Sequence, residues 1–365
     1  MRVKIEDVCD KATSNLKQSD VMNKKGLFPV FGAAGYLGKI DTFLQSKPYV
    51  AIVKDGAGIG RTMLLPAKSS VIGTMQYLLP KDNILPAYLY YVIKARHLEK
   101  YFSGATIPHI YFKDYKNEQF DLVNFEKQKQ IVHKLKVIEK IMTNLNDELK
   151  LFDELIKARF VEMFGTLSDN ENGFDVVIID DVCSLIKDGT HQTPQYIEDK
   201  EEGYKFLSSK DVMSQKIDWS KIKYIPADLH EKLYATLKPQ RNDILMSKNG
   251  VNYGVAAIND TDEVFDIYVS LALLRPKEMI DPIFFRCVIN NPETKRQFDS
   301  SIKGVGVPNL HLSEIKKTKI FLPPMKLQKE FVNFVKQVDK SKFEVQKSLE
   351  KTQQLYDSLM QKYFG

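Results

Sequence analysis

The chain has 365 residues, of which 43% are hydrophobic and 27% charged, and this composition is that of an ordinary soluble globular protein. The length is too great for one ordinary core and predicts two domains plus a connecting element. A formal net charge of +6 is modest for this size, so it favours a polyanionic partner only weakly.

Membrane spans, disulfides and metal sites are not expected. No apolar run reaches the roughly 18 residues that a membrane span needs, and the N-terminal sequence MRVKIEDVCDK is charged where a signal peptide would be apolar, so we expect a cytoplasmic protein. Cys9, Cys183 and Cys287 lie far apart without a CxxC pair, which favours small core residues. The six histidines are scattered, and we expect neither a metal nor a cofactor.

The first module, residues 1–123, consists of short apolar runs broken by Gly, Pro, Asn and Asp. This pattern predicts a mixed fold of short strands with a few helices. Strands are expected at Tyr49–Val53, Thr62–Leu65 and Tyr77–Leu79, and a helix at Pro86–Glu99 with Pro in its first turn.

Two glycine-rich stretches of this module resemble nucleotide-binding loops but lack their spacing. Gly32–Lys39 has five residues between its outer glycines and is followed by Ile40 where a P-loop needs Ser or Thr, and Gly56–Gly60 lacks the third glycine of a dinucleotide loop. We therefore expect tight turns. Basic side chains flank both turns and could meet a phosphate chain. They are Lys39, Lys54 and Arg61.

A long helix is predicted next, and it occurs twice. Glu126–Gly165 matches Lys326–Gly365 without a gap at an offset of 200, so Gln128 falls on Gln328. Both copies carry a heptad seam and no internal Pro or Gly, so each should be one helix of about 39 residues, roughly 58 Å long, and the two should pair. The first seam is Ile131, Leu135, Ile138, Met142, Leu145, Leu149, Phe152 and Ile156. The second is Phe331, Val335, Val338, Val345, Leu349, Tyr356 and Leu359, interrupted by Lys342 and Thr352.

The second module follows a polar linker and repeats the first with insertions. Ile5–Cys9 resembles Ile179–Cys183 at an offset of 174, whereas Val92-Ile93 matches Val288-Ile289 at an offset of 196, so the second copy has gained about 22 residues between these points. Its expected strands are Lys205–Leu207, Asp243–Ser247, Val255–Ile258 and Ser270–Leu274, and its expected helix is Pro282–Asn290. The predicted segments are module 1–123, helical region 124–165, linker 166–173, module 174–323 and helical region 324–365.

Catalytic motifs are scarce. The sequence has no HExxH, no GxSxG and no Asn-Pro-Pro-aromatic stretch of the kind that an amino-methyltransferase carries. Glu148-Leu149-Lys150 lies on the predicted coiled-coil helix, where Leu149 belongs to the seam, and Glu314-Ile315-Lys316 has no evident partner carboxylate. We expect no catalytic residues.

Polar loops rich in amide and basic side chains occur at matching places in the two modules. Such side chains can read base edges in a DNA groove or hold phosphates. The candidate DNA-binding residues are Tyr36, Lys39, Lys54, Arg61, Thr106, His109, Thr190, His191, Lys210, Lys248, Asn249, Asn252, Tyr253, Lys303 and Asn309.

The whole chain resembles the specificity subunits of type I restriction-modification systems. The matching stretches are FPVFGAAGYLGKID and VAIVKDGAGIGRT in the first module, IKDGTHQTP, YKFLSSKDV and DILMSKNGVNYGVAA in the second, and GATIPHIYFKDYKNEQFDL and GVGVPNLHLSEIKKTKIFLPPMKLQKE before the helices. The resemblance implies an α/β (α+β) fold of two target-recognition domains, each reading one half of a split double-stranded DNA site. It also implies an antiparallel coiled coil that acts as a ruler, two docked adenine-methyltransferase subunits, and motor-nuclease subunits for cleavage.

Two other classes of protein are alternatives to a non-catalytic recognition subunit. One is a fused nuclease or methyltransferase, which the missing motifs disfavour. The other is a coiled-coil adaptor that never touches DNA, which a salt-dependent DNA shift would exclude.

Overall fold

The computed structural model describes residues 1–22, 24–56, 58–104, 108–198, 201–302 and 308–365. The chain forms two compact units, which we name unit 1 (residues 1–148 and 345–365) and unit 2 (residues 149–344). Two helices of 40 residues, α4 (Phe125–Phe164) and α10 (Met325–Phe364), each contribute residues to both units. The helices are thus one residue longer than expected, and the units include parts of the helices rather than the modules alone.

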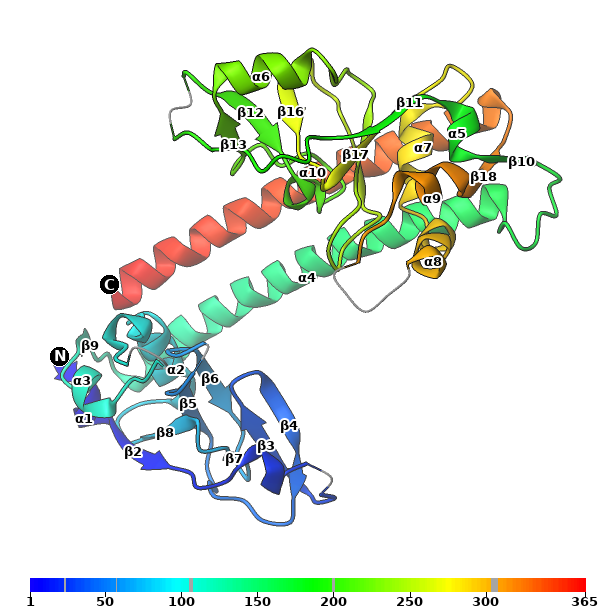
Figure 1. Ribbon diagram of the computed structural model, residues 1–365. Coiled ribbons are helices and arrows are strands. Elements are labelled where there is room, and N and C mark those ends of the chain that lie inside the picture. Colours follow the sequence, from blue (N-terminus) through cyan, green and yellow to red (C-terminus); the bar gives the residue numbers. More distant parts are fainter. Residues whose placement is uncertain (23, 57, 105–107, 199–200, 303–307) are drawn as a thin grey trace. The chain divides into compact units, whose positions relative to one another are not determined.

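The described residues of unit 1 form three small sheets (Figure 1). The strands are β1 (Arg2–Lys4), β2 (Cys9–Thr13), β3 (Phe28–Gly32), β4 (Gly35–Ile40), β5 (Tyr49–Val53), β6 (Thr62–Leu65), β7 (Ser70–Val71), β8 (Met75–Pro80) and β9 (Gln119–Asp121). The short helices are α1 (Ile5–Val8), α2 (Pro86–Lys94) and α3 (Phe112–Tyr115), with 3-10 turns at Gln18–Asp20 and Leu98–Tyr101. The sheet orders are β1-β9, β2-β8-β5-β6 and β4-β3-β7, and only β3 and β7 are parallel neighbours among these strands.

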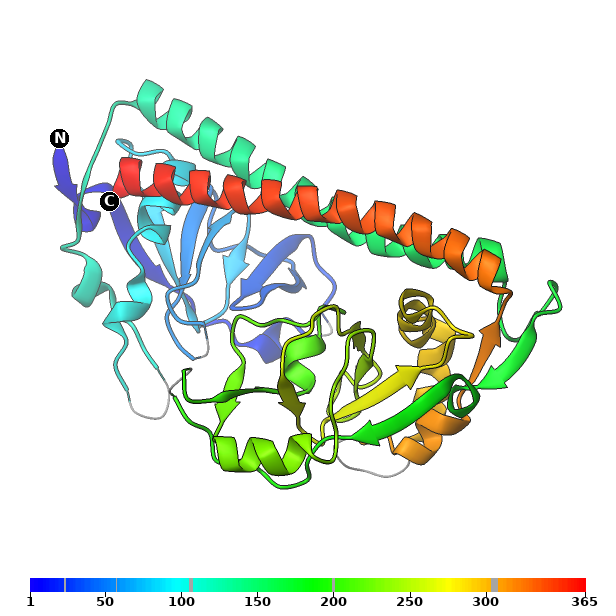
Figure 2. The same cartoon turned by 90° about the horizontal axis from the view of Figure 1, so that it is seen from above.

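The described part of unit 2 repeats this topology. The strands are β10 (Asp175–Ile178), β11 (Cys183–Asp188), β12 (Tyr204–Leu207), β13 (Lys223–Ile225), β14 (Ile244–Ser247), β15 (Ala256–Ile258), β16 (Phe265–Ile267), β17 (Leu271–Pro276) and β18 (Lys319–Leu322). The helices are α5 (Ile179–Val182), α6 (Ala227–Tyr234), α7 (Pro282–Ile289), α8 (Pro292–Ser301) and α9 (Leu312–Lys317), with a 3-10 turn at Ser209–Val212. The sheet orders β10-β18, β11-β17-β14-β15 and β13-β12-β16 match those of unit 1, and Figure 2 shows β11 and β17 side by side.

The predicted strands are confirmed as β5, β6, β8, β12, β14, β15 and β17, within two residues at each end. The predicted helix Pro86–Glu99 was too long. Helix α2 ends at Lys94, and His97 has a left-handed φ of 50°, which breaks the helix before the following 3-10 turn. Both glycine-rich stretches form the expected turns, with Gly35 at a φ of 111° and Gly56 at 84°.

The core of unit 1 lies on both faces of β5. Val50 and Ile52 pack in one apolar cluster and Tyr49, Ala51 and Val53 in another, and all five side chains are fully buried. Because both faces are covered, this β-branched segment needs no alternation of polar and apolar residues. Helix α2 lies against β5 and β6 on one side of this sheet.

The long helices pair antiparallel within unit 2. The Lys342 ammonium of α10 lies 2.5 Å from the Asp153 carboxylate of α4, and Arg159, farther along α4, lies 3.7 Å from Glu330, which is earlier on α10. Within unit 1 the Tyr356 hydroxyl of α10 donates to Glu139 of α4 at 2.9 Å. Every seam residue of both helices is buried or half-buried.

A buried glutamine fixes the start of each long helix to the main chain. Gln128 is fully buried, and its Oε1 accepts from the Leu85 amide at 2.8 Å while its Nε2 donates to the carbonyls of Asn83 and Val123 at 3.2 and 2.9 Å. Gln328, equally buried, makes the same three bonds in unit 2. Its partners are Met279, Asp281 and Pro323.

No helix of the described residues combines the length and the apolar character needed to span a bilayer. Burial raises the pKa of the Cys9 and Cys183 thiols to about 12, which fits the expected role of small core residues.

Candidate nucleic-acid interface

The β5–β6 connection of unit 1 is a glycine turn fixed by main-chain hydrogen bonds. We name it lysine–glycine loop 1 (residues 54–61). Gly56 and Gly60 have φ values of 84° and 81°, a left-handed conformation that glycine adopts without strain. The Gly60 amide donates to the Val53 carbonyl at 2.9 Å, and the Gly56 amide donates to the Pro108 carbonyl at 3.0 Å. The loop is therefore held against the segment that precedes α3.

Unit 2 builds the same loop, lysine–glycine loop 2 (residues 248–255). Gly250 and Gly254 have φ values of 85° and 86°. The Gly254 amide donates to the Ser247 carbonyl at 2.7 Å, and the Gly250 amide donates to the Pro308 carbonyl at 3.0 Å. The duplication seen in the sequence thus extends to individual main-chain hydrogen bonds.

Three predicted binding residues of unit 1 come together around loop 1. The half-exposed Lys54 ammonium lies 3.6 Å from the Asp55 carboxylate, and His109 Nδ1 lies 2.7 Å from the same carboxylate. The exposed Arg61 donates through Nη1 to the Ala33 carbonyl at 2.8 Å, in the turn between β3 and β4. These contacts link loop 1 to the β3–β4 turn and to the segment that contains His109.

The remaining two described candidates of unit 1 lie on the β3–β4 hairpin. Tyr36 is 60% exposed and packs edge-on against Phe31 near the turn. Lys39 is exposed but pairs with Pro29 at the other end of β4. Most of the glycine-rich stretch Gly32–Lys39 is therefore strand on either side of a short turn, and Lys39 lies outside the group around loop 1.

Lys248, the counterpart of Lys54, is buried. Its ammonium lies 2.9 Å from Asp188, the same carboxylate that His191 Nε2 approaches at 3.2 Å, and Lys248 is only 5% exposed. Partial burial of Asp188 would raise its pKa, but the hydrogen bond and charge of Lys248, together with His191, hold that pKa below its usual value. Lys248 thus forms a buried ion pair, unlike the half-exposed Lys54.

Tyr253 is buried as well. It is 8% exposed, its hydroxyl donates to Asp299, and Lys295 lies 3.8 Å from its ring centroid. Other candidates of unit 2 stay at the surface, as half-buried or exposed side chains. They are Thr190, His191, Lys210, Asn249, Asn252 and Asn309. Asn249 pairs with Asn309 in an isolated bridge, as Asp55 does with His109. Thr106 and Lys303 lie outside the described residues.

Sequence reasoning missed the acidic residues that organise these loops. Asp55 and Asp188 each hold two basic side chains, yet no acidic residue was among the candidates. The sequence did contain a pattern that marks both residues, because each aspartate directly follows a lysine and precedes a glycine. Within the described part of the chain, no three His, Cys, Asp or Glu side chains gather as a possible metal site.

The chain is built from two copies of one module, and each copy presents the same glycine loop at the same main-chain positions. A family model of the type I restriction modification DNA specificity domain matches residues 1–151 and 171–355, so the chain belongs to that family.

The relatives agree with this assignment. The type I restriction enzyme MjaVIII specificity subunit of Methanocaldococcus jannaschii is 24% identical over 310 residues, which span 80% of this chain and 72% of the relative. The solved S subunit of a type I restriction-modification system from M. genitalium has a TM-score of 0.60 at 16% identity, covering 100% of this chain and 96% of that one. A chain from a structural study of type I R-M complex assembly and conformational transition has a TM-score of 0.56 at 15% identity, covering 100% and 97%. At these identities the solved structures show the two-module fold, and none of these relatives supports a fused enzyme or a helical adaptor.

Proposed function

We propose that this chain is the specificity subunit of a type I restriction-modification complex and reads a split double-stranded DNA site, one half with each module. This proposal rests on one observation: lysine–glycine loops 1 and 2 make the same main-chain hydrogen bonds but carry different side chains. Asp55 in loop 1 corresponds to Asn249 in loop 2, and Arg61 corresponds to Val255. Carboxylate, amide, guanidinium and apolar groups present different hydrogen-bonding patterns to base edges, so two modules with one frame would prefer different sequences.

The paired segments 108–109 and 308–309 support the same reading. His109 and Asn309 each follow a proline whose carbonyl accepts a hydrogen bond from a loop glycine, and each forms a bridge to the second residue of its loop. Their side chains differ at a matched main-chain position. We propose that the described residues that contact DNA are Lys54, Arg61, His109, His191, Lys210, Asn249, Asn252 and Asn309, with Tyr36 and Thr190 beside them.

The helices α4 and α10 would set the distance between the two half-sites. Each has 40 residues, which corresponds to roughly 60 Å at 1.5 Å per residue. We further propose that the helices dock two adenine-methyltransferase subunits, that restriction subunits join this assembly, and that the chain itself is non-catalytic and acts in the cytoplasm.

An exchange of modules tests the proposal. Residues 174–322 are replaced by the same region of a family member with a different target, and methylated sites are mapped in a host carrying the matching methyltransferase subunits. We expect one half-site to change and the other to stay. The reciprocal exchange of residues 1–123 is the matched control and should change the other half. Changes in both halves from a single exchange would contradict the modular reading.

Catalysis is tested separately. The purified chain with a methyl donor and target DNA should transfer no methyl group until methyltransferase subunits are added. Methylation by the chain alone would overturn the non-catalytic assignment.

A further inference from the structure

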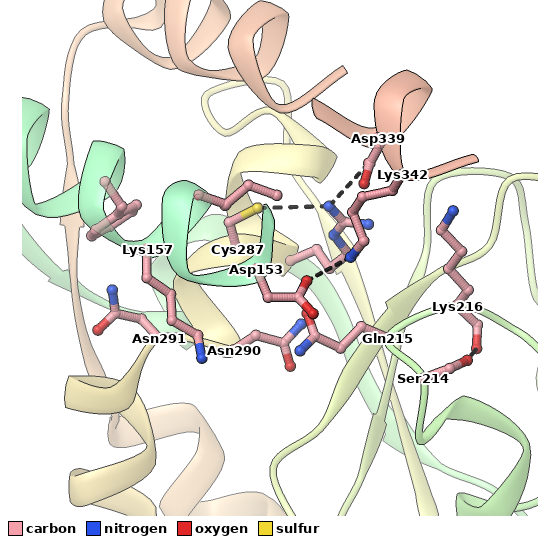
Figure 3. A pocket seen from close by; sticks show the side chains of 13 residues that line it. Asp153, Lys157, Ser214, Gln215, Lys216, Cys287, Asn290, Asn291, Asp339 and Lys342 are labelled. Atoms are coloured by element: carbon pink, nitrogen blue, oxygen red, sulfur yellow. Dashed lines mark hydrogen bonds and ion pairs between the residues drawn. The ribbon is translucent and has the colours of Figure 1, made fainter. Parts of the chain in front are cut away.

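Unit 2 contains a cavity among α4, α7, α10 and the segment 214–216 (Figure 3). Its volume is about 50 Å³. One water needs roughly 10–15 Å³ of cavity volume, so the cavity has space for about four waters or one small oxyanion. Arg286 and Cys287 of α7 line it, as do Asp339 and Lys342 of α10.

The corresponding place in unit 1 is filled by the protein's own side chains. The Glu139 carboxylate accepts hydrogen bonds from the hydroxyls of Tyr91 at 2.7 Å and Tyr356 at 2.9 Å. The Lys94 ammonium lies 2.9 Å from the Tyr356 hydroxyl and 3.3 Å from Glu139. Here one carboxylate is satisfied by three internal donors.

Smaller side chains open the cavity in unit 2. Helices α2 and α7 match at an offset of 196, which places Cys287 at the position of Tyr91 and Asn290 at that of Lys94. The long helices match at an offset of 200, which places Ile156 at the position of Tyr356 and Asp339 at that of Glu139. Two tyrosine rings and a lysine stem are therefore absent from the second copy, and the cavity occupies their place.

Arg286 is left with too few acceptors. The residue is 8% exposed, and its Nε has no hydrogen-bond partner among the described residues. Its Nη2 donates a weak hydrogen bond to Cys287 Sγ at 3.7 Å, and it lies 3.7 Å from the Asp339 carboxylate, which is beyond the usual 2.7–3.2 Å of an N–H···O bond. A buried guanidinium with five donors requires more acceptors than these contacts supply.

The remaining charges of the cavity favour an anion. Lys342 and Asp153 lie 2.5 Å apart and neutralise each other, and Asp339 offsets Arg286. Lys157 and Lys216 also line the cavity, are exposed, and have no ion-pair partner among the residues that the structure describes. The lining therefore carries an excess of two positive charges.

We propose that this cavity binds one small oxyanion of phosphate size, which accepts hydrogen bonds from the Nη groups of Arg286 and is attracted by Lys157 and Lys216. The planar guanidinium matches the spacing of two oxyanion oxygens, and the bound anion offers the Nη groups closer acceptors than Cys287 Sγ and the Asp339 carboxylate do. None of the residues that we propose to contact DNA lines this cavity.

Titration calorimetry of the full chain with inorganic phosphate, in a buffer free of other oxyanions, tests the proposal. We expect saturable 1:1 binding. The triple variant Ile156→Tyr, Cys287→Tyr, Asn290→Lys introduces the side chains of unit 1, and should fold, as judged by circular dichroism, without binding phosphate. Phosphate bound elsewhere, for example at the DNA-contacting loops, would persist in this variant, so equal binding by wild type and variant would overturn the proposal.

Surface variants test the site without altering the core. Lys157→Ala and Lys216→Ala should each weaken phosphate binding by roughly twofold to fivefold, the range expected of an exposed charge pair. Lys134→Ala, an exposed lysine of α4 in unit 1, is the matched control and should leave the affinity unchanged. An undetectable phosphate signal in the wild type, or binding of an acidic peptide but not of phosphate, would contradict a free-oxyanion site.

Discussion

Replacement of Gln128 by Met should destabilise the protein substantially although it changes no charge and little volume. Methionine keeps the unbranched side chain but has no amide, so the Leu85 N–H and the carbonyls of Asn83 and Val123 lose their partner at a fully buried site. Each unsatisfied buried group costs about 1–3 kcal/mol. Carbonyls tolerate a missing partner better than an N–H, so we expect a total loss of about 3–4 kcal/mol of unfolding free energy.

Urea unfolding followed by circular dichroism measures this loss. Hydrogen exchange adds a local readout, since the Leu85 amide should lose its protection first. The matched control is Gln130→Met, two residues along the same helix, where the side chain is exposed and the change should stay within about 0.5 kcal/mol. A Gln128→Met variant as stable as the control would show that the glutamine bonds do not fix α4 to the module.

Three further outcomes are expected. Lys54→Ala should weaken DNA binding by about 1–3 kcal/mol if the lysine contacts a base, or reduce the slope of log binding constant against log salt concentration by about one if it contacts a phosphate. Lys248→Ala should instead lower the free energy of unfolding by about 3 kcal/mol, as measured by urea unfolding. The pKa of Asp188 is lowered in the folded protein, so its charge stabilises the fold above pH 3.8, and this contribution is lost as the pH falls through the folded pKa. Asp188→Asn should therefore be less stable than wild type at neutral pH. The urea unfolding curves of the two proteins should converge in acid. Four residues inserted after Leu145 add about 6 Å to α4. At about 3.4 Å per base pair, the spacer between the two half-sites of mapped methylated sites should lengthen by one or two base pairs. A two-residue insertion turns the heptad seam of α4 away from α10 and should abolish DNA binding.

The long helices could be predicted from sequence because their signal is local and repeated. A heptad seam and the absence of Pro and Gly determine a helix without knowledge of distant contacts. The strand β5 was equally clear, since five apolar residues between turn signals form a segment buried on both faces. Strands such as β3 and β4, with Pro29 and Gly38 inside them, were missed because their pairing overrides local propensity.

The sequence predicted which residue types form the candidate site, but not which of these side chains are exposed. Lys54 and Lys248 have the same local surroundings in the sequence, a lysine after a buried strand and before a glycine turn. Their different burial depends on Asp188, which lies 60 residues away from Lys248 and is brought to it because β11 pairs with β17 beside β14. A contact of this separation has no local signature, so sequence reasoning assigned both lysines the same role.

The hydrogen bonds that repeat in both units explain why the loop side chains can differ so freely. Gln128 and Gln328 bond to main-chain groups, and the loop glycines do the same at Pro108 and Pro308. A hydrogen bond to a main-chain group does not depend on the side chain of the residue that supplies this group. Side-chain changes at exposed loop positions therefore cost little folding free energy. Divergence of side chains can then alter which bases each module prefers, while the two modules keep one fold.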